Sequence, residues 1–390
     1  MNRRVVSFFK YNKVFVFLYR LAGSILVSIL KIFVPIKDKR ILFVSYGGRK
    51  FDDSPKALYD SIKIDEFFKD YELIWAFDNP ASFDTGCKKI KVDTLRYYIA
   101  ALSSKIWISN SGIERGLNLK RKSTLEIDTW HGTPLKKIGL DVKTRIAYKK
   151  SKRKTKGIFC AQSEFDREIF SRLFNTDKEN ILLSDLPRND SLVKYTDVEI
   201  NNIKNNLGIA AQKKIILYAP TYREFDCDKL NGCYIAPPIN WDKWEQELGK
   251  EYIVLFRAHY EIVKILGVEN SEFVKDVSNY PCLNDLIAVS DLLVSDYSSI
   301  YFDYSITEKP MLCFAYDKDI YASQRGLYFD LEDIMPCNIN LDEDSLIQEI
   351  KNLSYDEYCT KTKIFKDRFA PYAGNATLAV INTIKEKVGK

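Results

Sequence analysis

The 390-residue sequence lacks several motifs that define common classes of nucleotide-binding protein. It has no Walker A motif and no G-x-G-x-x-G fingerprint, so neither a P-loop enzyme nor a nicotinamide-dependent enzyme is indicated. It has no zinc-finger spacing, RNP motif or basic-zipper pattern, so we predict no nucleic acid partner. Histidine is scarce, and only His131 and His259 can supply imidazole chemistry.

The cysteines also lack a spacing that indicates metal binding or redox chemistry. None of the eight forms a C-x-x-C pair, and Cys160 and Cys313 lie inside apolar, strand-like runs, where cysteine behaves as a small apolar residue. We therefore expect no disulfide framework and no zinc site, and we predict a reducing compartment, the cytoplasm. No cofactor is predicted, and metal dependence is left open. The cysteines are Cys87, Cys160, Cys227, Cys233, Cys282, Cys313, Cys337 and Cys359.

A long uncharged apolar run is missing at the N-terminus, although residues 14–36 are strongly apolar. Arg20 and Lys31 interrupt this segment, and its longest uncharged stretch, 21–30, is far shorter than the roughly 20 residues that cross a bilayer. On a helical wheel its polar residues share one narrow stripe. This pattern predicts an amphipathic helix that lies in the membrane interface and ends near Pro35. A signal peptide and a helix that covers the protein core are the alternatives.

Positive charge is concentrated in two segments. Residues 1–40 hold nine Lys or Arg against one acid, more than the net charge of +6 of the whole chain, so the remainder is close to neutral. Residues 143–156 hold eight Lys or Arg and no acid. Such a run is commonly a solvated helix face. Nucleic acid is the weaker alternative, since no nucleic-acid-binding motif supports it. If the N-terminal segment lies on an anionic membrane surface, each nearby cation contributes on the order of 1 kcal/mol.

From residue 39 onward, short apolar strands alternate with polar loops and helices. This alternation is typical of α/β domains with parallel sheets, and the chain length favours two domains. A polar stretch at 186–214 separates the two sets of strands, so we place the boundaries at 1–38, 39–195 and 196–390. The first segment is the membrane-associating helix, and the other two are Rossmann-like domains that face a cleft. The expected strands are 40–46, 72–77, 105–109, 125–130 and 157–162, then 213–220, 251–257, 291–296 and 310–316, with a helix at 163–174.

Polar motifs follow several of these strands directly. His131 follows 125–130, and His259 follows 251–257. In open parallel sheets, ligands bind beyond the carboxyl ends of the strands. We therefore expect the two imidazoles to face one cleft, where imidazole can act as a general base or stabilise phosphate oxygens. A structural role for each histidine is the alternative.

The segment 295–303, "SDYSSIYFD", predicts the start of a helix that can hold phosphate. Asp296, Ser298 and Ser299 are favourable N-cap residues, and the unpaired N–H groups of a helix start attract anions. An ordinary N-cap is the alternative. Three arginines can add bidentate phosphate contacts or else form ordinary ion pairs. They are Arg223, Arg257 and Arg325.

Five segments together resemble a known family. They are "DTWHGTPLKKIG", "YAPTYR", "FRAHY", "VSDYSSIYFDY" and "RGLYFD", and they occur over residues 128–330 in the order of the CDP-glycerol glycerophosphotransferase family, of the teichoic acid primase and polymerase type. The resemblance implies a glycosyltransferase-B-like fold bound peripherally to the cytoplasmic face of the cell membrane. It places residues 39–195 on the acceptor side and 196–390 on the donor side. Tyr260 departs from the family pattern, in which a proline is expected.

The resemblance also implies an activity. Glycerol phosphate passes from CDP-glycerol to a hydroxyl of a membrane acceptor, a polyprenyl-linked saccharide or glycerol phosphate, and CMP is released. The product is a teichoic acid or a related cell-surface or capsular polymer. His131 is implied as the catalytic base, and His259 as a second catalytic residue near the donor pyrophosphate. The predicted substrate-binding residues are Trp130, Gly132, Thr133, Thr221, Arg223, Arg257, Ser295, Asp296, Ser298, Ser299, Asp303 and Arg325.

Three other hypotheses stay open. The donor can be CDP-ribitol, because the sequence does not disclose how the pocket selects a polyol. The same fold also supports sugar transfer from a nucleotide sugar. The third hypothesis is a non-enzymatic nucleotide sensor or assembly scaffold at the membrane.

Overall fold

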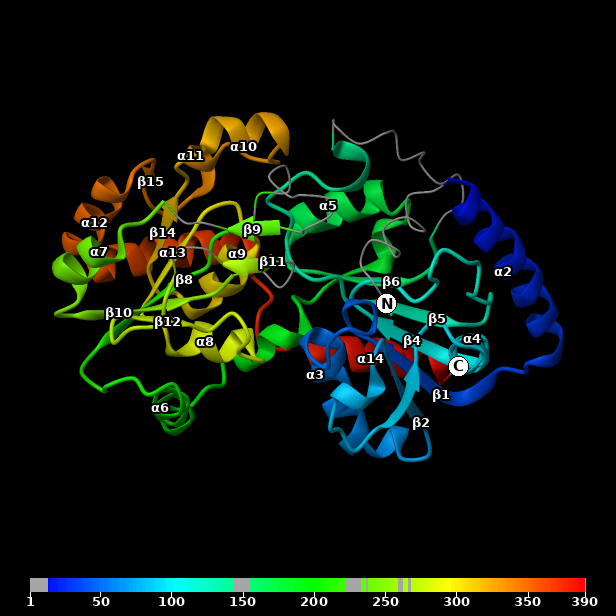
Figure 1. Cartoon of the computed structure of the whole chain (residues 1–390). Coiled ribbons are helices and arrows are strands. Elements are labelled where there is room, and N and C mark those ends of the chain that lie inside the picture. The colour runs from blue at the N-terminus through cyan, green and yellow to red at the C-terminus, as the bar shows by residue number, and fades with distance from the viewer. Residues whose placement is uncertain are drawn as a thin grey trace.

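A computed structural model describes residues 13–142, 155–221, 223, 233–235, 238–258, 262–265 and 268–389. Two parallel sheets lie side by side, each covered by helices (Figure 1). The predicted α/β class with two parallel-sheet domains is therefore confirmed. His259 and most of the basic run 143–156 lie outside the described residues.

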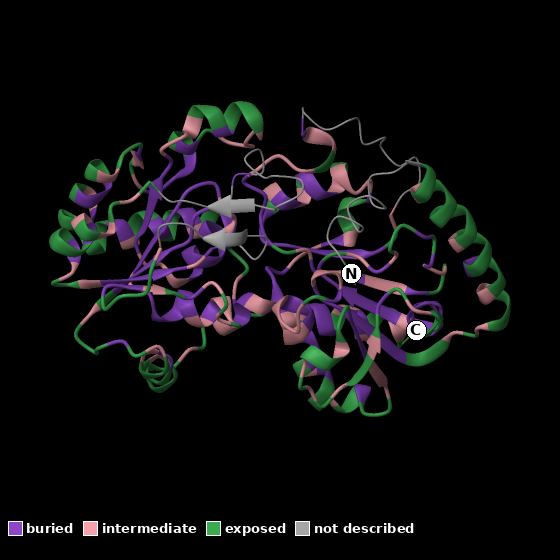
Figure 2. Cartoon of the chain, viewed as in Figure 1, coloured by how far each residue is buried: buried purple, intermediate pink, exposed green. Residues whose placement is uncertain are grey.

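The first sheet has seven parallel strands in the order β3-β2-β1-β4-β5-β6-β7. Its central strands are apolar and buried because helices cover both faces (Figure 2). Five strands were predicted; β3 and β7 were not, because one is polar and the other has three residues. The strands are β1 Lys37–Val44, β2 Glu72–Phe77, β3 Lys88–Lys91, β4 Ser104–Ser109, β5 Leu125–Asp128, β6 Ile158–Ala161 and β7 Ile181–Leu183.

The second sheet has six parallel strands in the order β12-β10-β8-β13-β14-β15. Its four central strands confirm the predicted ones, and the short edge strands β12 and β15 were not predicted. A separate parallel pair is formed by β9 and β11. The strands are β8 Lys214–Tyr218, β9 Cys233–Ile235, β10 Tyr252–Phe256, β11 Ile262–Ile265, β12 Val274–Asp276, β13 Leu292–Ser295, β14 Met311–Phe314 and β15 Ile339–Asn340.

The helices fill the connections between strands, as the alternating pattern predicts. The helix predicted at 163–174 is α5, with Ser163 at its N-cap position. Two short 3-10 segments, η1 Tyr46–Gly48 and η6 Pro187–Ser191, follow β1 and β7. The α-helices are α2 Lys13–Phe33, α3 Asp53–Ile64, α4 Leu95–Ser103, α5 Glu164–Leu173, α6 Asp197–Asn206, α7 Trp241–Leu248, α8 Leu283–Val289, α9 Ile300–Tyr304, α10 Lys318–Gln324, α11 Leu331–Ile334, α12 Glu343–Lys351, α13 Tyr355–Phe369 and α14 Ala376–Val388.

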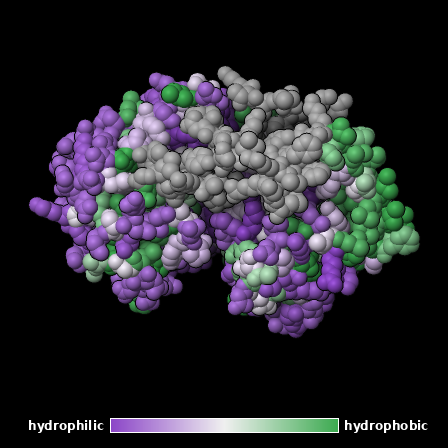
Figure 3. Space-filling view, viewed as in Figure 1, coloured by the Kyte–Doolittle hydropathy of each residue, from purple (hydrophilic) through white to green (hydrophobic). Residues whose placement is uncertain are grey.

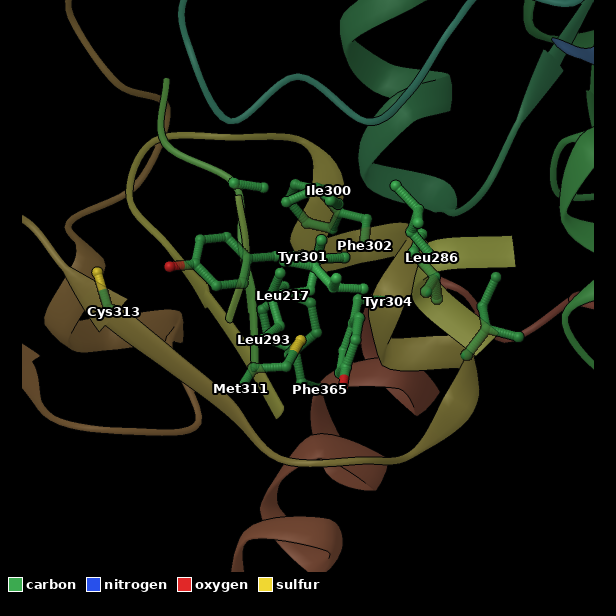
Figure 4. Close-up of a cluster of buried hydrophobic side chains, with 14 of the residues drawn as sticks. Leu217, Leu286, Leu293, Ile300, Tyr301, Phe302, Tyr304, Met311, Cys313 and Phe365 are labelled. Atoms are coloured by element: carbon green, nitrogen blue, oxygen red, sulfur yellow. The ribbon is translucent and has the colours of Figure 1, made fainter. Parts of the chain in front are cut away.

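The position of α9 is set by a buried apolar cluster (Figure 4). Tyr301, Phe302 and Tyr304 of this helix are buried among side chains of β13, β14 and α13. The Phe302 ring lies 5.4 Å from that of Phe365. Burial of a side chain of this size contributes about 1.5–3 kcal/mol. The cluster therefore anchors the helix that follows Ser298 and Ser299.

The C-terminal helix α14 returns to the first sheet and lies beside α3 (Figure 1). Val380, Ile381 and Ile384 join the apolar core of that sheet. Asp190 accepts hydrogen bonds of 2.8 Å from the backbone N–H groups of Ala376 and Thr377. The last helix thus packs on the first sheet although it belongs to the predicted segment 196–390, whose boundaries stay predictions.

Helix α2 confirms the predicted apolar N-terminal helix and ends two residues before Pro35. It is long and apolar enough to cross a membrane, yet only 6% of its most apolar window is buried. One narrow stripe packs on the first domain: Val27 is buried, and a Cβ at Gly23 would lie 2.6 Å from Cδ2 of Leu117. The rest of the helix forms an apolar surface at one end of the molecule (Figure 3).

Candidate active site

A cavity of about 960 Å³ lies at the carboxyl ends of strands of both sheets. Residues that follow β1, β5 and β7 form one wall, and residues that follow β8, β10 and β13 form the other. This is the edge at which parallel sheets bind ligands. Of the predicted site residues, those that line the cavity are Trp130, His131, Gly132, Thr133, Thr221, Arg257, Ser298, Ser299, Asp303 and Arg325.

The turn after β5 places His131 on this wall. Asp128 accepts a hydrogen bond of 2.9 Å from the backbone N–H of Trp130, which closes the turn. The Trp130 ring stacks on the imidazole at a centroid distance of 4.2 Å. Nδ1 of His131 lies 2.9 Å from the carbonyl oxygen of Asn110, which can only accept a hydrogen bond. Nδ1 therefore carries the proton, and Nε2 is the basic nitrogen of the neutral ring.

The surroundings of His131 favour this neutral form. The side chain is exposed to the cavity, but the protein around it desolvates the imidazolium and lowers its pKa below 6.5. The Asn110 carbonyl and the Asp53 carboxylate oppose this shift, and the Arg188 cation adds to it. At neutral pH the ring is thus ready to accept a proton.

Three residues with an unusual backbone conformation lie around the same ring. Tyr46, Asp53 and Trp130 have φ angles of 46°, 64° and 52°, a region that non-glycine residues rarely adopt. All three line the cavity. Strain of this kind costs of order 1–3 kcal/mol per residue and is typical of functional sites.

The opposite wall carries hydroxyls and cations. Ser298 and Ser299 precede α9, and Oγ of Ser298 accepts a hydrogen bond of 3.2 Å from the N–H of Ile300. Arg257 donates to the carbonyl oxygens of Val277 and Tyr280 at 3.1 and 2.9 Å, and burial lowers its pKa. Among the described residues this guanidinium forms no ion pair with a carboxylate. Such a desolvated cation is suited to an anionic ligand.

Other predicted residues on this wall already have protein partners or a buried position. Arg325 donates a hydrogen bond to the carbonyl of Lys137 in the first half of the chain. The carboxylate of Asp303 accepts from Arg188 at 2.7 Å and from Asn189 at 2.9 Å. Oγ1 of Thr221 is buried and has no hydrogen-bond partner among the described residues.

Three predicted site residues are not among those that line the cavity. Arg223 is buried and pairs with Asp296 at 2.8 Å and with Asp317 at 2.7 Å, so the structure shows the ion-pair alternative. Asp296 also accepts a hydrogen bond from the N–H of Thr221 at 2.8 Å. Ser295 donates to the carbonyl of Ala219 at 2.6 Å. Through these bonds, Asp296 and Ser295 hold Thr221 and Ala219, which line the cavity.

Sequence reasoning missed three residues on the first wall: Tyr46, Asp53 and Arg188. Each lies shortly beyond the carboxyl end of a strand, the same signal that identified His131. Tyr46 and Asp53 follow β1, whose end was predicted but carried no motif that we recognised. Arg188 follows β7, which is too short to predict. Among the described residues, no group of three or more His, Cys, Asp or Glu side chains is placed to hold a metal ion.

Residues 26–386 match the family described as CDP-Glycerol:Poly(glycerophosphate) glycerophosphotransferase. The chain therefore belongs to this family, as its motifs predicted.

Two relatives and one solved structure show which proteins of this family the chain resembles. It is 36% identical over 352 residues to the teichoic acid poly(glycerol phosphate) polymerase of Staphylococcus epidermidis, covering 86% of this chain and 48% of the relative, so it spans about half of that protein. It is 32% identical over 364 residues to the teichoic acid glycerol-phosphate transferase of Staphylococcus aureus, covering 88% and 92%. The structure of a histidine variant of the wall teichoic acid polymerase TagF, soaked with CDPG, matches with a TM-score of 0.83 and 31% identity, covering 95% of this chain and 97% of that one.

Proposed function

We propose that the protein transfers glycerol phosphate from CDP-glycerol to a hydroxyl group of a membrane-borne acceptor and releases CMP. The product is a teichoic acid or a related cell-surface or capsular polymer. The observation that carries this proposal is the neutral imidazole of His131 on one wall of the cavity, opposite the hydroxyls of Ser298 and Ser299 on the other. Family membership supports the donor, since a related TagF structure was soaked with CDPG. In this proposal the two domains form a glycosyltransferase-B-like enzyme with a cleft between them.

CDP-glycerol binds mainly to the second domain in this proposal. Ser298 and Ser299 hold the pyrophosphate through their hydroxyls and the N–H groups that follow them. Arg257 and Arg325, which line the same cavity, neutralise its charge. His259, in the "FRAHY" segment, acts near the same phosphates.

The reaction is an in-line displacement at the phosphorus that bears glycerol. The acceptor oxygen forms a bond to this phosphorus while the bond from phosphorus to the bridging oxygen breaks, and CMP leaves with that oxygen. Nε2 of His131 takes the proton of the acceptor hydroxyl. General-base assistance of this kind contributes about 10²–10⁴-fold to the rate. The cations of the second wall stabilise the charge that grows on the leaving phosphate.

The acceptor reaches the site from a membrane. We propose that α2 lies on the cytoplasmic face of the bilayer with its exposed apolar side in the lipid. Lys31 donates to the carbonyl of Asn118 at 2.6 Å, and Tyr19 to that of Arg115 at 3.1 Å, so the helix lies along the domain surface. A helix held in this way cannot cross the bilayer without carrying the polar loop 113–121 into it. This contact favours peripheral attachment over a membrane span. The outward apolar residues include Phe17, Leu18, Leu21, Ile25, Ile29, Ile32 and Phe33.

Product analysis tests the proposal against its rivals. The purified full chain is incubated with CDP-glycerol and a lipid-linked saccharide or glycerol-phosphate acceptor, and nucleotide release is followed by chromatography. We expect CMP release that requires the acceptor and falls at least 10²-fold in His131→Ala. Faster CMP release from CDP-ribitol would assign the other polyol. UDP release from a UDP-sugar would identify a glycosyltransferase, and binding without turnover a sensor or scaffold.

A further inference from the structure

The side chain of Arg188 joins three parts of the site at one point. Nη1 donates to the carboxylate of Asp53 at 2.7 Å, and Nη2 donates to that of Asp303 at 2.7 Å. Nη2 also lies 3.2 Å from the carbonyl oxygen of His131. The guanidinium is 12% exposed, and its two carboxylate partners are 6% and 3% exposed. The buried guanidinium attracts both buried carboxylates, and its planar geometry fixes the partners relative to one another.

These partners come from elements that are far apart in the sequence. Asp53 begins α3 in the first domain, and Asp303 lies on α9 in the second, 115 residues from Arg188. Because α9 follows Ser298 and Ser299 directly, a bond to Asp303 also locates the two serines. The bond to the His131 carbonyl fixes the loop after β5, which carries the imidazole. One guanidinium thus binds directly to elements of both halves of the site.

We propose that Arg188 is the positioning residue of this site: by bonding Asp53, Asp303 and the His131 carbonyl together, it holds the base of the first domain in register with Ser298 and Ser299 of the second. This role rests on the proposed function, since Arg188 acts through His131. In this proposal Asp303 links the two domains through Arg188 and does not contact the donor.

The charges around His131 provide a second readout of this arrangement. Among the described residues, the titratable groups that face the ring are Tyr46 of η1, Asp53 of α3 and Arg188 of η6. Tyr46 donates a hydrogen bond of 2.6 Å to Asp53, and burial raises its pKa well above the ordinary value, so it stays neutral. The carboxylate of Asp53 raises the pKa of His131, and the guanidinium lowers it. Removal of the Asp53 charge should therefore lower the pKa of His131, and removal of the Arg188 charge should raise it.

NMR titration measures this directly, because the chain has only two histidines. In protein labelled at histidine, the His131 signal is assigned by its loss in His131→Gln. We expect the pKa of His131 to rise in Arg188→Met and to fall in Asp53→Asn. In Arg188→Lys the pKa should stay near the wild-type value because the charge is kept. This NMR titration does not depend on activity. If the wild-type protein shows no glycerophosphotransfer, the proposed function is refuted, and the titration still tests the arrangement of Arg188, Asp53 and His131.

Kinetics separate positioning from general stabilisation. A displacement of the base by about 1 Å can cost on the order of 10²-fold in kcat. We expect a loss of that size in Arg188→Met with a smaller change in KM, and a loss of about tenfold in Arg188→Lys, whose ammonium cannot hold three partners in one plane. The matched control is Arg40→Met, which removes a guanidinium of similar burial that pairs with Glu72 at 2.5 Å on the first sheet. It should lower the melting temperature and leave kcat and the histidine pKa unchanged.

Several results would overturn the proposal. Wild-type kcat and histidine pKa in folded Arg188→Met would do so, as would shifts of the same sign in Arg188→Met and Asp53→Asn. If Arg188→Met does not fold, Arg188→Lys and Asp53→Asn decide the question in the same assays. Unchanged kcat in both of them would then contradict the positioning role.

Discussion

The backbone of Gly132 passes so close to Ser299 that a Cβ at position 132 would lie 3.1 Å from Oγ of that serine. Gly132 also has a φ of 137°, which an L side chain rarely adopts. The close approach and the positive φ both favour glycine at the point where the loop after β5, which carries His131, meets the start of α9. Gly132 and Ser299 both line the cavity, so its two walls approach each other closely here.

Substitution of Gly132 should disturb this contact. We expect Gly132→Ala to lower kcat about tenfold, because the added Cβ strains the backbone and displaces Ser299 slightly, and a full shift of about 1 Å can cost about 10²-fold. The control is Gly86→Ala, since Gly86 has no positive φ and no heavy atom within 4 Å of its added Cβ. Steady-state kinetics on both variants check the prediction. Normal turnover in Gly132→Ala would mean that the close approach is not needed.

Arg257 should contribute to donor affinity. A hydrogen bond to a charged group contributes about 1.5–3 kcal/mol, so Arg257→Met is expected to raise the Kd for CDP-glycerol about 10- to 150-fold. Its present bonds are to two backbone carbonyls, which water can replace when the side chain is lost. Isothermal titration with CDP-glycerol measures the effect, with Arg40→Met as the control. Equal affinity in the two variants would exclude Arg257 from the donor site.

A buried carboxyl beside the site predicts a pH-dependent stability. Asp166 accepts hydrogen bonds of 2.8 Å from Thr133 and from the N–H of Gln162, yet burial raises its pKa to about 7. The folded state thus keeps a proton that the unfolded state releases near pH 4. The stabilisation is complete below pH 4 and is lost as pH rises to about 7.

The variant Asp166→Asn lacks this titration. Its free energy of unfolding should therefore improve relative to the wild type between pH 4 and pH 7. Urea unfolding at several pH values measures the difference, and the exposed Asp319→Asn is the control. A constant difference between Asp166→Asn and the wild type across this range would show that Asp166 is ionised in the folded protein.

The outward face of α2 should determine membrane binding. Ile25 and Ile29 are 55% and 49% exposed, and burial of each in lipid contributes about 1.5–3 kcal/mol. The double variant Ile25→Glu, Ile29→Glu should lose at least 10²-fold in affinity for anionic vesicles, measured by co-sedimentation. The matched control, Val198→Glu, changes a side chain on α6 that is 68% exposed and should bind as the wild type does. Full binding by the double variant would contradict the interfacial position of α2.

The sequence predicts most of the framework because the central strands carry their own signal. The runs that become β1, β4, β8 and β13 are apolar and are buried on both sides. The edge strands β12 and β15 lack this signal because they have three and two residues. A helix that returns from the second half to the first, as α14 does, is set by tertiary contacts that no local pattern contains.

The site divides in the same way. His131 and Ser299 follow strands of clear pattern, so their position is predictable from the sequence. The tautomer of His131 depends on the carbonyl of Asn110, 21 residues away. Arg223 pairs with Asp317, which is 94 residues away. A sequence shows that an arginine is present, but only the fold shows whether a carboxylate already pairs with it.

The central claim is that the imidazole of His131 takes the proton of the acceptor hydroxyl. The most direct measurement follows CDP-glycerol consumption in single turnover by ³¹P NMR, with the wild type and His131→Gln and with donor affinity measured in parallel. The account predicts donor binding within about threefold of the wild type, and a rate of phosphorus transfer lower by about 10²–10⁴-fold. Transfer by folded His131→Gln at the wild-type rate would contradict it.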